Sequence, residues 1–363
     1  MDIKQAIFEE FKQLVAIDSE SGNEQPFLEH LYNKFENEFG AECLYDKAGN
    51  LIMRVPGAAG KEPILLCCHG DTVKPGIGIE AVMAEDGNIT SKGDTILAAD
   101  DKAGIVEIIW AIRTAKEKGI ELPPLEVVIT FGEEVGLLGS TALDYSLLKA
   151  RKGIVIDGGD LNEIVIGGPT HLVYEAQVLG KAAHAAHIPS EGINALKAAA
   201  NAVATFTVGQ VDHETVCNIG RFVCDVATNV IPEKVAIKGE VRSLDESKML
   251  AHWETIKNAF NTEAAAMGAT FEILEEKTHY KAYNLDEAHP LVEKLKVILT
   301  EMGYDVKAQR ILGGTDAANF NTGGIATVVI GTGGKGAHSL TESVNINDMV
   351  KVVDILLELL PQL

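Results

Sequence analysis

Histidine and carboxylate residues stand directly after apolar runs that are typical of buried β-strands. Open α/β sheets bind ligands in the crevice outside the carboxyl ends of their strands, so residues at these positions are expected to lie together. Histidines and carboxylates gathered at one such edge can bind metal ions. In chain order the cases are 64–68 before His69 and Asp71, 126–131 before Glu133 and Glu134, 153–156 before Asp157, and 326–330 before a glycine-rich stretch that reaches His338.

The composition excludes several classes of partner. The chain has 363 residues and a net charge of −22, whereas nucleic-acid and anionic-membrane binders need a basic surface. None of its apolar runs approaches the ~20 residues of a membrane span. Its five cysteines include the neighbours Cys67 and Cys68 within an apolar run, which suits buried thiols in a reducing compartment better than disulfides. We therefore expect a soluble, cytoplasmic protein without nucleic-acid or membrane partners.

The first and last parts of the chain alternate helix and strand patterns. Near-continuous apolar strands between helices indicate an α/β fold with a mixed, largely parallel sheet that is covered by helices. The helices are expected at 3–17, 25–39, 102–118, 289–302 and 347–360, and the strands at 51–55, 63–68, 126–131, 153–157 and 326–330.

The pattern changes near residue 169. From there the order strand, helix, strand, strand, helix, strand is that of a ferredoxin-like fold. We therefore expect a discontinuous metal-binding catalytic domain, 1–169 and 282–363, interrupted by a smaller α+β domain at 170–281. The strands of this inserted domain are expected at 172–179, 217–221, 235–244 and 270–274, and its helices at 194–207 and 248–267.

Taken singly, the candidate residues have ordinary structural explanations. A histidine at a strand end is more often structural than metal-binding, and acidic residues such as Asp100 and Asp101 commonly stabilise a helix N-terminus. Glu133 and Glu134 are more informative, because two adjacent carboxylates repel each other unless a positive charge lies nearby. Either of them can bind a metal while the other accepts a proton from water, and the spacing does not choose between them.

Taken together, the set indicates a site for two divalent ions. Histidine, aspartate and glutamate ligands without a thiolate suit Zn, and also Mn or Co. Two neighbouring ions that share one carboxylate can activate a bridging water. The glycine-rich stretch at 331–338 lacks the spacing and the helix start of a phosphate-binding loop, so we do not expect a nucleotide site.

Five motifs resemble, in order, the metal-site signatures of one family. The family is that of the di-zinc metallopeptidases that include peptidase T, carboxypeptidase G and aminoacylase, and the chain is most similar to peptidase T. The resemblance spans the whole chain and implies a zinc-bearing α/β domain with an inserted lid domain. The motifs are CCHGDTVKPG at 67–76, AADDKAG at 98–104, TFGEEVGLLGS at 130–140, VIDGGD at 155–160 and GGKGAHSLTE at 333–342.

The resemblance implies two metals that share one carboxylate. Glu133 aligns with the general base of the family, and Asp71 with the residue that orients the first histidine ligand. The Asp100–Asp101 peptide bond is implied to be cis. The implied ligands are His69, Asp100 and Asp157 for one ion, and Asp100, Glu134 and His338 for the other.

In the inserted domain, GKAAHAAHIPSEGINAL at 180–196 resembles the family's Gly-Lys-x-x-His-Ala segment. The resemblance places His184 at its histidine, which is implied to contact the scissile carbonyl, often from the partner subunit of a dimer. His187 is the nearby alternative. Asn229 and Arg242 match positions that hold a substrate carboxylate, although Arg242 can equally form an ion pair on a strand surface.

The segment Gly313-Gly314-Thr315-Asp316 resembles a loop on the substrate side of the family's site. Its backbone amides, at Gly314 and Thr315, can bind a carboxylate or a carbonyl.

These assignments lead us to expect a cytoplasmic di-zinc aminopeptidase for small peptides, of the tripeptidase type and dimeric through its lid domain. An N-acyl amino acid deacylase of the same family is an alternative, because both kinds of substrate present an amide and a carboxylate. A non-catalytic binding protein on this scaffold is another, but it would have no need for the unligated Glu133. A two-metal phosphoesterase would need more cationic groups than these motifs offer.

Overall fold

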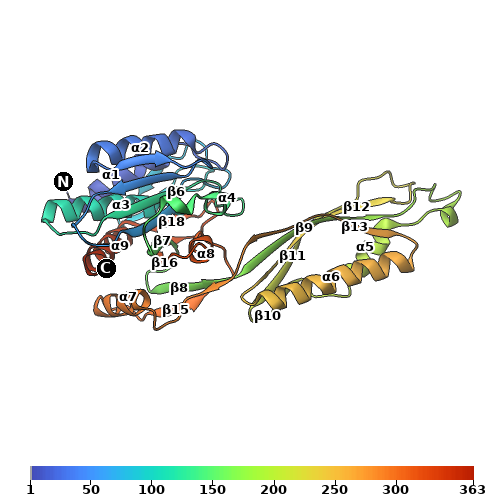
Figure 1. The fold of residues 1–363 in the computed structure, drawn as a ribbon. Coiled ribbons are helices and arrows are strands. Elements are labelled where there is room, and N and C mark those ends of the chain that lie inside the picture. Colours follow the sequence, from blue (N-terminus) through green and yellow to red (C-terminus); the bar gives the residue numbers. More distant parts are fainter. Residues whose placement is uncertain (1) are drawn as a thin grey trace. The chain divides into compact units, whose positions relative to one another are not determined.

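The structure is a computed structural model that describes residues 2–363 (Figure 1). Its backbone contacts divide the chain into two compact units. The first unit contains the residues up to Gly167 together with Asn284–Arg310 and Gly314–Leu363, and the second contains Gly168–Tyr283 and Ile311–Gly313.

The largest sheet of the first unit is mixed, with a parallel centre. The strand order is β1-β2-β6-β3-β7-β16-β8-β14, and β15 pairs with β8. The four central strands β6, β3, β7 and β16 run parallel, while β1, β2 and β8 join antiparallel. The fold class predicted from the sequence is therefore confirmed. The strands are β1 (Glu42–Tyr45), β2 (Leu51–Val55), β3 (Ile64–His69), β6 (Leu125–Thr130), β7 (Lys152–Gly158), β8 (Glu163–Gly168), β14 (Tyr283–Asn284), β15 (Lys307–Arg310) and β16 (Ala326–Gly331).

The helices of this unit bury their apolar faces against the sheet and against one another. Every residue of β3 and β6 is buried, as expected for parallel strands that are covered on both faces. Helices α1, α3 and α9 pack together, α3 contacts β3 and β7, and α2 contacts β1 and β2. The helices are α1 (Ile3–Val15), α2 (Gln25–Phe39), α3 (Ala99–Lys118), α4 (Leu138–Ala142), α7 (Pro290–Glu301), α8 (Ala317–Thr322) and α9 (Ile346–Leu359).

The start of α3 is irregular. Asp100 and Asp101 have non-helical backbone angles, so the regular helix starts after them, where the sequence predicts it. The peptide bond between these two residues is cis, as the resemblance implied. Ala98, just before them, has a left-handed backbone with φ 60°.

Several short elements were not predicted from the sequence. A four-stranded antiparallel sheet in the first unit has the order β17-β18-β5-β4. Its strands have two to four residues, which is too short for an apolar period to show. They are β4 (Ala81–Met83), β5 (Asn88–Ser91), β17 (Gly334–Lys335) and β18 (Ser343–Asn345).

The second unit has the predicted ferredoxin-like order, with one extra edge strand, β10. Its sheet is antiparallel in the order β10-β11-β12-β9-β13, and burial alternates along β9 and β12. Both helices pack on β9 and β12 (Figure 1). The elements are β9 (Thr170–Leu179), α5 (Ala195–Val203), β10 (Gly209–Asp212), β11 (Thr215–Val223), β12 (Lys234–Ser243), α6 (Glu246–Ala266) and β13 (Thr270–Tyr280).

The predicted end of β13 at residue 274 is wrong. The strand continues to Tyr280 through a largely polar and exposed stretch that shows no apolar pattern. Among residues 2–363, no helix is both long enough and apolar enough to cross a membrane.

Candidate metal centre

The first group of candidate ligands comes from neighbouring parallel strands. His69 ends β3 and Asp157 lies near the end of β7, and these strands pair in parallel, so their carboxyl ends share one edge. Nε2 of His69 is 2.9 Å from Oδ1 of Asp100 and 3.8 Å from Oδ1 of Asp157. One donor atom from each of the three residues lies within 4.8 Å of the other two, so one cation can contact all three.

The second group shares Asp100 with the first. Nε2 of His338 is 3.3 Å from Oδ2 of Asp100 and 2.8 Å from Oε2 of Glu134. Donor atoms of these three residues also lie within 4.8 Å of one another. The two oxygens of Asp100 therefore face different histidines, which is the arrangement of a carboxylate that bridges two cations.

His69 is fixed in place through both its ring and its backbone. Its Nδ1 donates to the backbone carbonyl of Asp71 at 2.9 Å, and Oδ1 of the same residue is 3.5 Å away. Its backbone N–H donates to Oδ2 of Asp101 at 3.1 Å. Contact with a carbonyl or carboxylate at Nδ1 leaves Nε2 as the metal-binding nitrogen.

Asp71 is fully buried and also holds the loop that carries the two glutamates. Its carboxylate accepts hydrogen bonds from the backbone N–H of Glu133 at 2.9 Å and of Glu134 at 3.3 Å. The hydroxyl of Ser21 donates to it at 2.7 Å. Burial alone would raise the pKa of the Asp71 carboxyl, but His69, the Ser21 hydroxyl and the backbone N–H of Glu133 outweigh burial and hold this pKa below its usual value.

Glu133 and Glu134 have different surroundings. The Glu133 side chain is buried and belongs to neither group of candidate ligands. Burial raises the pKa of Glu133 well above its usual value, and the nearby charge of Asp157 acts in the same direction. Burial also raises the pKa of Glu134, to about 7. A cation beside these carboxyls would favour their ionised forms.

The same carboxylates raise the pKa values of the two histidines. Hydrogen bonding to Asp100 raises the pKa of His338 to about 9. Burial by itself lowers the pKa of His69, but the hydrogen bonds that its ring donates to Asp100 and Asp71 outweigh burial and hold this pKa well above its usual value. Both shifts favour the protonated form of the ring and have the same cause, the carboxylates that surround the two histidines.

The donor set fits divalent metals that accept oxygen and nitrogen ligands. Cys67 and Cys68 precede His69 directly, but burial raises the pKa of both thiols well above the usual value. The Cys68 thiol contacts the carbonyl oxygen of Ile156 at 3.6 Å. A site of two histidines and three carboxylates remains, which suits Zn, Mn or Co.

Asp316, which was not predicted as a site residue, binds both ends of the glutamate loop, the segment between β6 and α4 that carries Glu133 and Glu134. Thr130, at the end of β6, donates its hydroxyl to Oδ2 of Asp316 at 2.5 Å, and Ser140 on α4 donates to Oδ1. Asp316 is buried and directly follows Thr315, so the predicted substrate loop and the glutamate loop share this anchor. In the sequence, the only indication of a role for Asp316 is that it ends the segment 313–316, which resembles a loop on the substrate side of the family's site.

In the second unit, backbone contacts bring two predicted site residues, His184 and Asn229, close together. The N–H of Ala185 donates to the carbonyl oxygen of Asn229 at 2.9 Å, and His184 forms a β-bridge with Val230. Nδ1 of His184 accepts the backbone N–H of His187 at 3.2 Å, and the two rings lie 4.3 Å apart. This contact occupies Nδ1 and leaves Nε2 of His184 to serve as a donor.

Arg242 takes part in the ion pair that was the structural alternative for this residue. Its Nη2 is 3.1 Å from Oε2 of Glu240, and its Nη1 donates to the hydroxyl of Tyr280 at 3.3 Å. Nε2 of His171 is 2.8 Å from the same oxygen of Glu240. A substrate carboxylate at Arg242 would therefore share the guanidinium group with Glu240.

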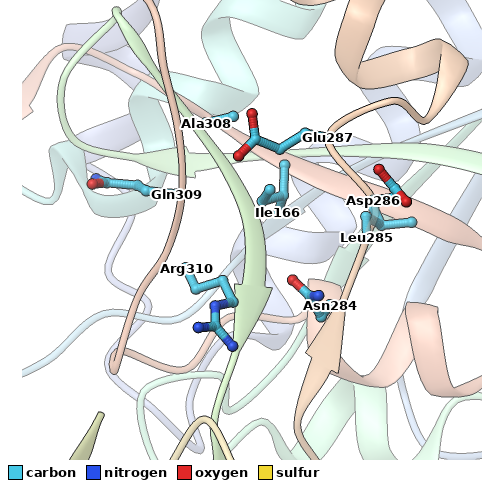
Figure 2. A pocket seen from close by; sticks show the side chains of 8 residues that line it. All are labelled: Ile166, Asn284, Leu285, Asp286, Glu287, Ala308, Gln309 and Arg310. Atoms are coloured by element: carbon cyan, nitrogen blue, oxygen red, sulfur yellow. The ribbon is translucent and has the colours of Figure 1, made fainter. Parts of the chain in front are cut away.

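A pocket of about 600 Å³ in the first unit is separate from both groups of candidate ligands (Figure 2). None of the predicted site residues lines it. Both carboxylates of its lining already have partners: Asp286 accepts the N–H of Ala288 at 2.8 Å, and Glu287 pairs with Lys296 at 2.6 Å. The lining residues are Ile166, Asn284, Leu285, Asp286, Glu287, Ala308, Gln309 and Arg310.

A largely parallel sheet with two histidines and three carboxylates at its carboxyl edge defines a metallopeptidase-like α/β protein. Residues 65–362 match the model of peptidase family M20/M25/M40, and the chain belongs to this family. The comparison therefore confirms the resemblance that the five motifs carry.

Individual relatives are similar to this chain over nearly its full length. The protein YqjE of Bacillus subtilis (strain 168) is 35% identical over 365 residues, which cover 98% of each chain. The crystal structure of aminopeptidase PepT from Bacillus cereus ATCC 10987 is 35% identical, with a TM-score of 0.90 over 99% of this chain and 98% of that one. The crystal structure of a tripeptidase from Staphylococcus aureus subsp. aureus Mu50 is 32% identical, with a TM-score of 0.94 over the same shares.

Proposed function

We propose that the protein is a di-metal aminopeptidase that hydrolyses small peptides. The observation that carries this proposal is that Asp100 belongs to both groups of candidate ligands while the buried Glu133 belongs to neither. A carboxylate between two cations and a free carboxyl beside them are the parts that metal-assisted hydrolysis needs. The similarity to an aminopeptidase and to a tripeptidase supports a peptide substrate.

His69, Asp100 and Asp157 would hold one divalent ion, and Asp100, Glu134 and His338 the other. Zn fits these donors best, with Mn and Co as alternatives. When bound, the ions would supply Lewis acidity toward the scissile carbonyl and make the attacking water more acidic.

Glu133 is assigned the role of general base and then of general acid. It takes a proton from the water as the water oxygen bonds to the carbonyl carbon, and it returns this proton to the amine nitrogen as the C–N bond breaks. Asp71 would keep the Glu133 backbone and the His69 ring in the geometry that this transfer requires.

The substrate contacts that the resemblance implies are part of this proposal. His184 would donate to the scissile carbonyl oxygen, and Asn229 and Arg242 would hold the substrate carboxylate. The amides of Gly314 and Thr315 would bind the other end of the substrate.

We also infer a homodimer that forms through the second unit, in a cytoplasmic setting. β13 is the edge strand of that unit's sheet, and Ile273 and Leu274 on it are 40% and 58% exposed. Exposed edge strands can pair with another chain. The cysteines, including the buried Cys67, Cys68 and Cys217, are free, which suits a reducing compartment.

The test is a substrate panel with the protein loaded with Zn, Mn or Co. The panel contains dipeptides and tripeptides, their N-blocked versions and N-acyl amino acids, and the amine released is measured. Hydrolysis of free peptides alone supports the proposal and shows the preferred length. Hydrolysis of N-acyl amino acids alone would replace it with a deacylase function that uses the same residues. Two bound ions without any hydrolysis would support the proposed metal ligands and contradict a small peptide as the substrate.

A further inference from the structure

Glu342 connects the loop that carries His338 to the turn that carries Asp100. Its Oε2 accepts the backbone N–H groups of Leu97 at 2.8 Å and Ala98 at 2.9 Å. Its Oε1 accepts the backbone N–H of Asp100 at 3.0 Å. One carboxylate therefore accepts from three of the four backbone amides of residues 97–100. The last of these residues, Asp100, is the candidate ligand that both groups share.

The shape of this turn explains why a carboxylate is needed there. Ala98 has a left-handed backbone with φ 60°, and this turns successive N–H groups toward one point. Leu97 and Ala98 are fully buried, so water cannot replace a missing acceptor. Each buried N–H that lost its partner would cost about 1–3 kcal/mol.

Glu342 is placed to act on both histidines of the candidate centre. It lies four residues after His338 and is itself 2% exposed. The oxygens of Asp100 are 2.9 Å from Nε2 of His69 and 3.3 Å from Nε2 of His338. A shift of the Asp100 backbone would therefore change both distances at once.

We propose that Glu342 is a positioning residue that sets the place of Asp100 between the two metals and ties the His338 loop to it. The inference rests on the proposed function, because it takes Asp100 and His338 as ligands. The three N–H groups stabilise the charged form of Glu342 through hydrogen bonds, although burial opposes this form and raises the pKa of the carboxyl. The second ion depends most on Glu342, because His338 comes from a loop and its side chain is 55% exposed, whereas His69 is held on a buried strand.

A simpler explanation is that Glu342 only stabilises the start of α3. Both explanations predict a less stable protein without this carboxylate, but only the positioning role predicts weaker metal binding. Glu126 offers a matched control in the first unit. It is also 2% exposed, and its carboxylate accepts the backbone N–H groups of Lys149 and Ala150, each at 2.9 Å.

The experiment compares the wild-type protein with Glu342→Gln and Glu126→Gln. A glutamine can keep one acceptor oxygen on Leu97 and Ala98, but its amide NH2 then faces the N–H of Asp100 and cannot accept from it. Calorimetric titration of the metal-free proteins with Co²⁺ measures both affinities, and the visible spectrum of bound Co²⁺ reports its coordination. Circular dichroism checks that each variant is folded, and Glu342→Ala is used if the glutamine variant is not.

We expect the Glu342 variant to bind the second Co²⁺ about 10–100-fold more weakly, with an altered spectrum, as for other residues that orient ligands. The Glu126 variant should keep both affinities. Unchanged Co²⁺ binding in Glu342→Gln, or an equal loss in Glu126→Gln, would overturn the positioning role. A wild-type protein that binds fewer than two ions would instead contradict the proposed function, and the inference with it.

Discussion

The carboxylate of Asp71 accepts the backbone N–H of Glu133, with its Oδ1 2.9 Å from the amide nitrogen. The same oxygen lies 3.5 Å from Nδ1 of His69. One buried side chain therefore contacts both the first histidine of the candidate centre and the loop of the proposed base. A residue in this position can affect catalysis without touching substrate or metal.

We predict that Asp71→Asn lowers kcat by about 10–100-fold while most of the bound metal is retained. Asparagine can keep its oxygen on His69 and the Glu133 backbone, but its NH2 then replaces Oδ2, which accepts from Ser21 and from the backbone N–H of Glu134. An NH2 group cannot accept these hydrogen bonds, and the negative charge beside His69 is lost. Steady-state kinetics and metal analysis of the purified variant test this. Wild-type kcat would show that the Asp71 carboxylate has no part in positioning the site.

Glu133→Gln should keep both metals and lose activity by at least about 10²–10⁴-fold, because glutamine cannot accept the proton of the attacking water. Metal content measured by mass spectrometry and turnover of the best peptide provide the test. Glu134→Gln is the matched variant and should lose metal from the second group. Full activity in Glu133→Gln would exclude this residue as the base.

The metal-free protein should become less stable as pH rises from about 4.5 to about 7, in part through Glu134. The folded-state pKa of this carboxyl is raised from 4.5 to about 7, so its neutral form is the one that favours folding. That contribution is complete below pH 4.5 and is lost as pH rises through 7. Thermal unfolding of chelator-treated wild type and Glu134→Gln across this range measures it, because glutamine removes the titration. An identical pH dependence in the two proteins would contradict the expectation.

His338 should extend this loss of stability to higher pH. Its pKa rises from 6.5 to about 9, so its protonated form stabilises the metal-free protein fully below pH 6.5. The contribution disappears as pH passes 9. Bound Zn²⁺ or Co²⁺ should reverse the trend, because the metal takes over the charge of the proton. Unfolding temperatures at pH 6 and pH 9, with and without metal, provide the measurement.

Asp316→Ala should destabilise the protein by about 1–3 kcal/mol, because the buried hydroxyls of Thr130 and Ser140 lose their short hydrogen bonds and keep only long contacts to carbonyl oxygens. It should also lower kcat, since these residues flank the glutamate loop. Urea unfolding and steady-state kinetics test the two effects. Thr300→Ala, at an exposed position of α7, is the control and should change the stability by less than about 0.5 kcal/mol. Equal stabilities for the two variants would refute this role of Asp316.

The sequence by itself determined the fold class and the positions where ligands can gather. Apolar runs of buried strands and the residues that follow them are local features, so His69 and Asp157 could be assigned to one sheet edge before any contact was known. The helix pattern likewise begins after Asp101, where the regular part of α3 starts. The order of elements in the second unit was readable for the same reason.

The local pattern could not separate Glu133 from Glu134, because adjacent residues share it, and the resemblance alone assigned their roles. The tertiary structure adds that Glu134, and not Glu133, lies in a group of candidate ligands, because the two side chains differ in what packs around them. It also revealed Glu342, which binds the amide of Asp100 from 242 residues away. A contact across such a separation depends on how whole elements pack, and a polar residue in a loop has no periodicity that would indicate its partner. Short strands such as β17 and β18 escaped prediction because their pairing partners, and not their own composition, make them strands.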